Sequence, residues 1–112
     1  TDVLNFTVPT GIGDQPVQKS AAAELLYTQP NPFNPSTTVF FETRVGGRVR
    51  LDVFDARGRH VRTLVDKDFE AGTHGVPWDG RADDGRPVSS GVYFTRLLAQ
   101  GHADGLKMVL LK

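Results

Sequence analysis

The stretch "RVRLDVFDARGRHVRTL", residues 48–64, decides the fold class of this chain. Its first half alternates the apolar residues Val49, Leu51 and Val53 with Arg50, Asp52 and Phe54. This two-residue period is typical of a strand with one face on a core. The turn residues of "DARG", 55–58, follow, and a second strand is expected over residues 60–67. The stretch therefore predicts two strands joined by a turn.

The same pattern recurs along the chain, with Gly- and Asp-rich punctuation about every 10 to 20 residues. Strands are predicted at residues 24–29, 37–44, 48–55, 60–67, 72–79, 91–99 and 106–112. Seven short strands at this spacing predict an all-β domain with two packed sheets. Pro77 cannot donate a ladder hydrogen bond, so its strand is expected to lie at a sheet edge or to be interrupted there. The strand from Gly91 has little polar alternation and is expected inside a sheet, covered on both faces.

A proline-rich segment, "QPNPFNP" at residues 29–35, precedes the strand at 37–44. Proline fixes its own φ and holds the preceding residue extended, so the segment is expected to be stiff. We predict that it carries the chain from one sheet to the other, with a ligand-binding loop as the alternative. Phe33 is expected to anchor in the end of the core, and the asparagines to hydrogen-bond nearby backbone groups.

The first 23 residues form a separate unit in this interpretation, with the sandwich over residues 24–112. The apolar residues Val3, Leu4, Phe6 and Val8 predict a strand-like arm, and "TGIGDQPVQKS" after it is typical of a flexible linker. The arm could add to a sheet edge of a neighbouring copy, fold back on its own sandwich, or be the last strand of a preceding domain.

The composition of the chain limits the kinds of partner and chemistry that we expect. The 112 residues contain 13 basic and 13 acidic side chains, giving zero formal charge and a pI of about 6.8, so nucleic acid is not an expected partner. Apolar runs such as residues 39–41 and 109–111 are far shorter than the roughly 18 residues that cross a bilayer, so membrane insertion is not expected. The chain has no cysteine, which excludes disulfides and thiol chemistry. Because it begins with Thr1, we expect a processed chain or a piece of a longer one.

Candidate chemical sites are few. Asp79, Asp83 and Asp84 lie in a Gly-containing loop, but their spacing is not that of a calcium loop, and a plain turn is expected. The three histidines are far apart, and Ser89 and Ser90 lack the flanks of a nucleophile elbow. We therefore predict no catalytic residue, no metal ligand, no cofactor and no enzymatic activity. Trp78 has the phase of a core residue, with a sugar-stacking platform as the alternative.

Several motifs together resemble a known family: "NPFNPSTT" at 31–38, residues 48–64, "AGTHGVPWDGRADDGRPVSSGVYFTRL" at 71–97 and the terminal "LKMVLLK". They resemble the immunoglobulin-like C-terminal domain shared by the type IX secretion sorting-domain family and the flagellar hook-capping (FlgD) Ig-like family. The resemblance covers residues 25–112. It implies an immunoglobulin-like, fibronectin III-like β-sandwich, and the arm predicted from the apolar pattern precedes this sandwich in the sequence. Two departures are Pro77 in mid-strand and Phe40, an apolar residue on an outer face that suggests an added contact.

The resemblance implies a non-enzymatic C-terminal module of a secreted bacterial protein, acting in export, sorting and cell-surface attachment. Its partners would be secretion or anchoring machinery, or a preceding domain of the same protein, and its location the bacterial cell surface. It also implies that the terminal strand carries the sorting signal: Lys107, Met108, Val109, Leu110, Leu111 and Lys112. One alternative is a filament subunit that donates its arm to a neighbour in a homopolymer. Another is a carbohydrate-binding domain that uses Trp78 and Tyr93.

Overall fold

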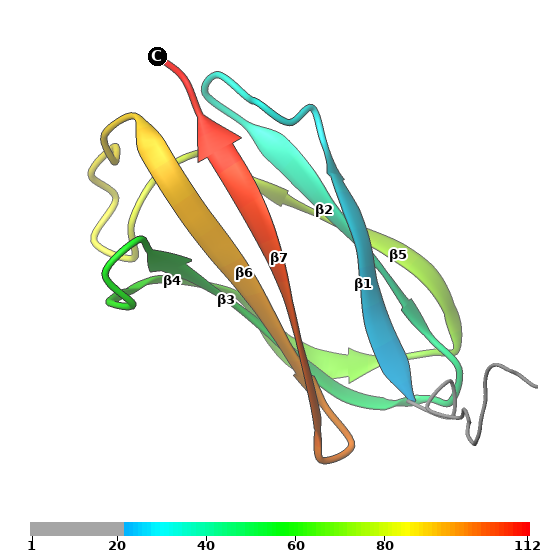
Figure 1. Ribbon diagram of the computed structural model, residues 1–112. Coiled ribbons are helices and arrows are strands. Elements are labelled where there is room, and N and C mark those ends of the chain that lie inside the picture. The colour runs from blue at the N-terminus through cyan, green and yellow to red at the C-terminus, as the bar shows by residue number, and fades with distance from the viewer. Residues whose placement is uncertain (1–21) are drawn as a thin grey trace, which may run out of the picture.

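The computed structural model describes residues 22–112, which form two antiparallel sheets packed face to face (Figure 1). One sheet has the strand order β1-β2-β5 and the other β4-β3-β6-β7. The strands are β1 (Ala23–Gln29), β2 (Thr37–Thr43), β3 (Gly47–Asp55), β4 (His60–Phe69), β5 (Gly72–Trp78), β6 (Gly91–Ala99) and β7 (His102–Leu110). The prediction of an all-β sandwich with seven strands is confirmed.

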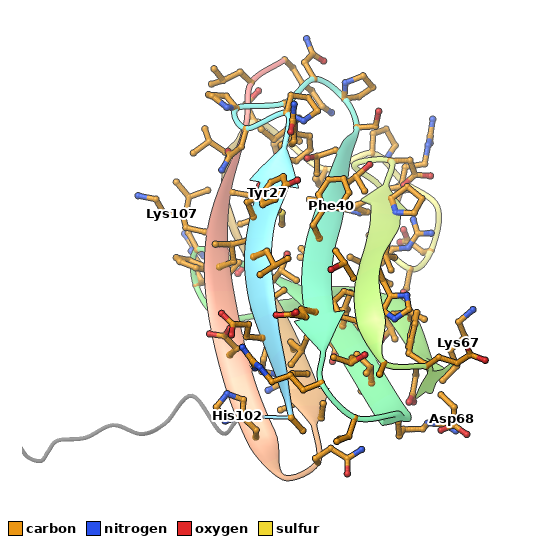
Figure 2. The ribbon with its side chains drawn as sticks, turned by 90° about the vertical axis from the view of Figure 1, so that its right-hand side faces the viewer. Tyr27, Phe40, Lys67, Asp68, His102 and Lys107 are labelled. Carbon is orange, nitrogen blue, oxygen red and sulfur yellow. The ribbon has the colours of Figure 1, made fainter. Side chains whose placement is uncertain are left out.

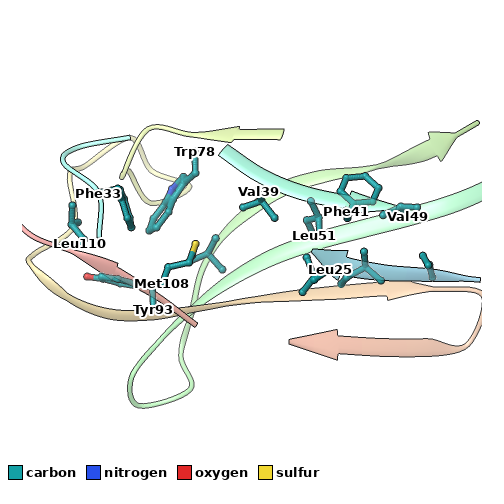
Figure 3. Close-up of a cluster of buried hydrophobic side chains, with 14 residues drawn as sticks. Leu25, Phe33, Val39, Phe41, Val49, Leu51, Trp78, Tyr93, Met108 and Leu110 are labelled. Carbon is teal, nitrogen blue, oxygen red and sulfur yellow. The ribbon is translucent and has the colours of Figure 1, made fainter. Parts of the chain in front are cut away.

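The core lies between the sheets and follows from the two-residue period. On β3, Val49, Leu51 and Val53 are buried, as the opening stretch predicts. Figure 3 shows that their partners come from both sheets, with an aromatic group at one end. In that group Trp78 packs against Phe33 and Tyr93, each at a ring-centroid distance of 5.5 Å. The predicted core role of Trp78 is confirmed.

Strand boundaries agree with the prediction within two residues, except for the last strand. β7 begins at His102 and not at residue 106. Gln100 and Gly101 both have positive φ, 52° and 75°, so they close a tight two-residue hairpin turn. Antiparallel pairing with β6 then starts directly at the Ala99↔His102 pair. The polar and glycine-rich sequence hid this strand start because it lacks apolar alternation.

The two expectations about strand position hold, with one correction. β5, which contains Pro77, lies at a sheet edge, and β6 lies inside its sheet. However, β6 is covered on one face only, and the prediction of two covered faces was wrong. Its burial alternates, and Phe94 on the outer face is 41% exposed. Phe94 is thus an exposed aromatic residue and not part of a core.

The proline-rich loop between β1 and β2 does not carry the chain between sheets, because both strands belong to the same sheet and pair with each other. That prediction was wrong. The loop instead reaches across the end of the sandwich to β7, where Phe33 forms a parallel bridge with Leu110. Phe33 is 2% exposed, so its predicted role as an anchor in the end of the core is confirmed.

Phe40 lies on the outer face of the three-stranded sheet, where Tyr27 stacks on it at 4.8 Å (Figure 2). A Cβ atom at Gly75, on the neighbouring strand, would come within 2.9 Å of the Phe40 ring. The small Gly75 therefore makes room for the ring. The added contact that Phe40 suggested is made within the chain, by Tyr27.

Candidate interaction site at the C-terminal strand

The terminal segment 107–112 presents its side chains to two environments. Met108 and Leu110 are fully buried in the core, as the alternation of a strand requires. Lys107, Leu111 and Lys112 are exposed and Val109 is partly exposed. A partner that binds the folded domain can therefore contact only the second set. Of the six residues assigned by resemblance, the fold brings those four to the surface.

The free edge of β7 is closed by the proline-rich loop. The Asn31 side chain acts like a strand residue: its Nδ2 donates to the Lys107 carbonyl at 3.3 Å, and its Oδ1 accepts from the Val109 amide at 3.0 Å. Phe33 continues the pattern through its backbone, donating to the Val109 carbonyl at 2.9 Å and accepting from the Leu111 amide at 3.0 Å. The predicted bonds from the asparagines are thus made by Asn31. The loop thus bonds one edge of the terminal segment from residue 107 to 111, and β6 pairs with the other edge up to Leu110.

A further contact closes the seam between β7 and β1. The Leu25 amide donates to Oδ2 of Asp104 at 2.8 Å, although the two residues belong to different sheets. Sequence reasoning placed Asp104 in a loop and gave it no role. A carboxylate at an inward-phased position of an edge strand is the signal that indicates such a cap.

An exposed aromatic patch lies beside β7 on the outer face of the four-stranded sheet. Phe94 pairs directly with Lys107 on β7 and with Phe54 on β3. The Arg96 guanidinium lies 4.7 Å from the Phe54 ring centroid, a cation–π contact. The residues Phe54, Phe94 and Arg96, with Asp55, Ala56 and Gly58, line a shallow pocket of about 400 Å³. Sequence reasoning missed this patch because it assigned Phe94 to a covered face.

Beside the patch, a buried carboxylate holds the outer face together. Asp52 is 0% exposed and accepts from Arg50 Nε at 2.8 Å and from Thr63 Oγ1 at 2.8 Å. His60 Nε2 lies 3.0 Å from the same carboxylate. Burial raises the pKa of Asp52, but the hydrogen bonds from Arg50, His60 and Thr63 outweigh it, so the pKa lies below its ordinary value. Asp52 is therefore the ionised centre of a structural network.

The acidic loop after β5 makes turn and cap contacts. Asp79 lies 2.9 Å from Nη1 of Arg62, and Asp84 lies 3.0 Å from Nε of Arg86. Asp83 Oδ1 accepts from the Thr63 amide at 3.0 Å, so it caps β4. Within residues 22–112 no group of three or more His, Asp or Glu side chains has the arrangement of a metal site. The three carboxylates point at separate partners, as in the predicted turn.

The aromatic residues behind the carbohydrate hypothesis are inaccessible. Trp78 is 1% exposed and Tyr93 is 7% exposed, so neither ring can stack on a sugar. The Trp78 indole N–H instead donates to the Arg81 carbonyl at 2.9 Å, and the Tyr93 hydroxyl donates to the Ser89 carbonyl at 2.7 Å. The assignment of these two residues to a sugar site was wrong. Val3, Leu4, Phe6 and Val8 of the arm lie outside the described residues.

Replacing Asn31 with alanine should loosen the terminal strand. The change removes both side-chain bonds to β7, and we expect a loss of about 1–2 kcal/mol in the free energy of unfolding, from about 0.5–1.5 kcal/mol per hydrogen bond. Urea unfolding measures it. The matched control is Asn34→Ala in the same motif, which should change stability by less than about 0.5 kcal/mol because, within residues 22–112, the Asn34 side chain has no hydrogen-bond partner. Equal effects of the two variants would contradict the role given to Asn31.

Taken together, two sheets of three and four antiparallel strands in this order define an immunoglobulin-like β-sandwich. The family model of the FlgD Ig-like domain matches residues 35–101, and the chain belongs to this family. No curated protein matches it. Residues 22–112 contain no helix long and apolar enough to span a membrane.

Solved structures show the same fold. Dimeric latent PorU from Porphyromonas gingivalis is similar at a TM-score of 0.63 and 20% identity, over 80% of this chain and 9% of PorU. PorZ, an essential bacterial surface component of the type-IX secretion system of the same organism, matches at 0.52 and 24%, over 77% and 11%. FlgD from P. aeruginosa matches at 0.52 and 20%, over 80% and 68%. The chain thus spans about a tenth of PorU or PorZ.

Proposed function

We propose that this chain is a non-enzymatic, protein-binding module of a secreted bacterial protein, and that export or surface-attachment machinery binds the outer side of β6 and β7. The module would act at the cell surface, as the type IX sorting domains that its motifs resemble do. The similarity to PorZ, a surface component of that secretion system, supports the same setting.

The observation that carries the proposal is the way in which β7 is held. Because Asn31 and Phe33 occupy its free edge, a partner cannot pair with residues 107–111 as an added strand without displacing the loop. Recognition then falls to the outward side chains. Lys107 and Val109 project next to Val92 and Phe94 of β6. This surface combines apolar side chains with the cations Arg96 and Lys107, so it fits an apolar protein surface rimmed by carboxylates.

The test is export of a reporter fused ahead of the full chain in a bacterium with type IX secretion. We expect the wild-type fusion to reach the cell surface. For the double variant Lys107→Glu with Val109→Asp, the amount of fusion protein retained inside the cell should be at least tenfold larger. Both changes are on the outer face, so circular dichroism should show an unchanged fold. The matched control is Thr38→Glu with Gln29→Asp, on the outer face of the opposite sheet, which should be exported normally. Normal export of the Lys107 and Val109 variant would refute the proposed surface.

The filament hypothesis remains a prediction, because the arm on which it depends lies outside the described residues. In the described part, loop or side-chain contacts cap three of the four edge strands: β1 by Asp104, β4 by Asp83 and β7 by Asn31 with Phe33. Each cap covers part of its strand, whereas β5 has no such contact along its outer edge within residues 22–112, so β5 is the edge that we expect to accept an added strand.

A further inference from the structure

The three-stranded sheet ends at β5 with an open side. Within residues 22–112, β5 pairs with β2 and has no strand on its other side. In Figure 2, β5 is the last strand of the front sheet, and Lys67 and Asp68 of β4 project beyond it. An edge strand with unpaired backbone groups is a template for another strand.

Behind this open side, β4 is only partly faced by β5, at the end where Phe69 packs against His74 at a ring-centroid distance of 4.9 Å. None of the β4 residues is fully buried, whereas each of the other six described strands contributes at least one buried residue. Yet the apolar side chains of β4 pack against the core while staying partly exposed: Val61, Leu64, Val65 and Phe69. In a sandwich, inner faces are normally covered by the opposite sheet. The four-stranded sheet is one strand wider than its partner, and β4 is the strand that the partner sheet covers only in part.

We propose that residues 3–8 of the same chain form the missing strand, added antiparallel to the free edge of β5 and covering the inner face of β4. In the register that we propose, Leu4, Phe6 and Val8 face the core, with Phe6 opposite His74 and Leu4 opposite Val76. The proposal is independent of the proposed function, because it concerns the opposite edge of the molecule from β7.

The sequence pattern fits this position. Leu4, Phe6 and Val8 recur at every second residue, so they share one face of a strand, while Asn5 and Thr7 face the other way. The inward-phased residues of β5, His74 and Val76, are partly exposed and would gain cover. At the far end Pro77 has no N–H, which ends the ladder there. An arm of this length therefore matches the part of β5 that can pair.

The linker has the right reach for pairing within one chain. The Ala22 carbonyl accepts from the Arg44 amide at 2.6 Å, and the pairs Ala23↔Thr43 and Thr43↔Gly72 place the start of β1 at the end where β5 begins. The free edge of β5 is then about three strand spacings, or roughly 14 Å, away. A flexible linker over residues 10–21 has a root-mean-square span of roughly 17–21 Å. An arm that ends at this side of the sheet runs antiparallel to β5. Since short tethers give effective concentrations in the millimolar range, the own chain is favoured over a neighbour.

The first test is a disulfide across the proposed pair. The chain has no cysteine, so Thr7→Cys with Thr73→Cys introduces one defined pair. Directly opposite strand residues have Cα atoms about 4.5–5.5 Å apart, within the range that a disulfide bridges. We expect the double variant to oxidise within the monomer at least tenfold faster than a matched control, Thr7→Cys with Ala103→Cys, whose second cysteine lies at an exposed position on β7. Equal rates, or a bond between two chains, would overturn the proposal.

The second test separates the two faces of the arm in the full chain. Phe6→Asp puts a charge against β4 and should lower the melting temperature by roughly 5 °C or more, as far as deletion of residues 1–9 does. Asn5→Asp puts the same charge on the outward face and should leave the melting temperature unchanged. The intact chain should be monomeric at every concentration. Melting temperatures that are equal for wild type, Phe6→Asp and the deletion, or a concentration-dependent oligomer lost on deletion, would rule out pairing within the chain.

Discussion

Replacing Trp78 with alanine should cost about 3–5 kcal/mol of unfolding free energy, the range for truncating a large buried aromatic residue. Trp78 fills the end of the core between Phe33 and Tyr93, and its indole N–H is bonded to the Arg81 carbonyl. Domains of this size have unfolding free energies of only about 5–15 kcal/mol, so the Trp78→Ala variant should lose a large part of its stability. Urea unfolding followed by circular dichroism measures the loss.

The control for this prediction is another aromatic truncation, Phe94→Ala. Phe94 is 41% exposed on the outer face, so its removal should cost about 1 kcal/mol or less because it leaves no enclosed cavity. A loss below 1 kcal/mol for Trp78→Ala, or an equal loss for the two variants, would show that Trp78 does not support the core.

Acid should destabilise the domain through Asp52. Its pKa is lowered in the folded state, so the unfolded chain binds a proton more readily than the folded one. The stabilisation is therefore fully present above the unfolded pKa of about 3.9 and is lost as pH falls through the folded pKa. Asp52→Asn should lower the unfolding free energy at pH 7 by about 3 kcal/mol, since it leaves the cations around a buried site without their counter-charge. We expect the difference in unfolding free energy between wild type and Asp52→Asn to decrease as pH falls from 5 to 2.

Asp66→Asn is the matched control, because Asp66 pairs with Arg48 on the same outer face but is 40% exposed. Exposed ion pairs contribute about 0–1 kcal/mol, so this variant should stay close to wild type at pH 7. A gap for Asp52→Asn that is as large at pH 2 as at pH 7 would mean that the lost stability comes from altered packing and not from the carboxylate's charge.

The strand pattern shows how far sequence reasoning reached. Val49, Leu51 and Val53 predicted both a strand and its buried face, because a period of two residues has no other regular solution. Phe33 was predicted as an anchor from its place between prolines. In contrast, the start of β7 at His102 was missed, because a hairpin closed by Gln100 and Gly101 needs no apolar residue at the turn. Phe94 was wrongly assigned to a covered face, since an apolar residue in a strand can be buried or exposed, and only tertiary packing decides which.

The sequence by itself determined the all-β class, the approximate strands and the inward position of Trp78, because local periodicity is a property of the chain. Pro77 limited its strand to a sheet edge or an interruption, and the structure shows an uninterrupted edge strand. Only the tertiary structure decided that β1 and β2 share a sheet, that Asn31 and Asp104 close the two sheets along β7 and β1, and that Asp52 is buried among cations. These contacts join residues far apart in sequence, for example 78 positions between Asn31 and Val109. Their partners are set by strand order and register, which no local pattern encodes.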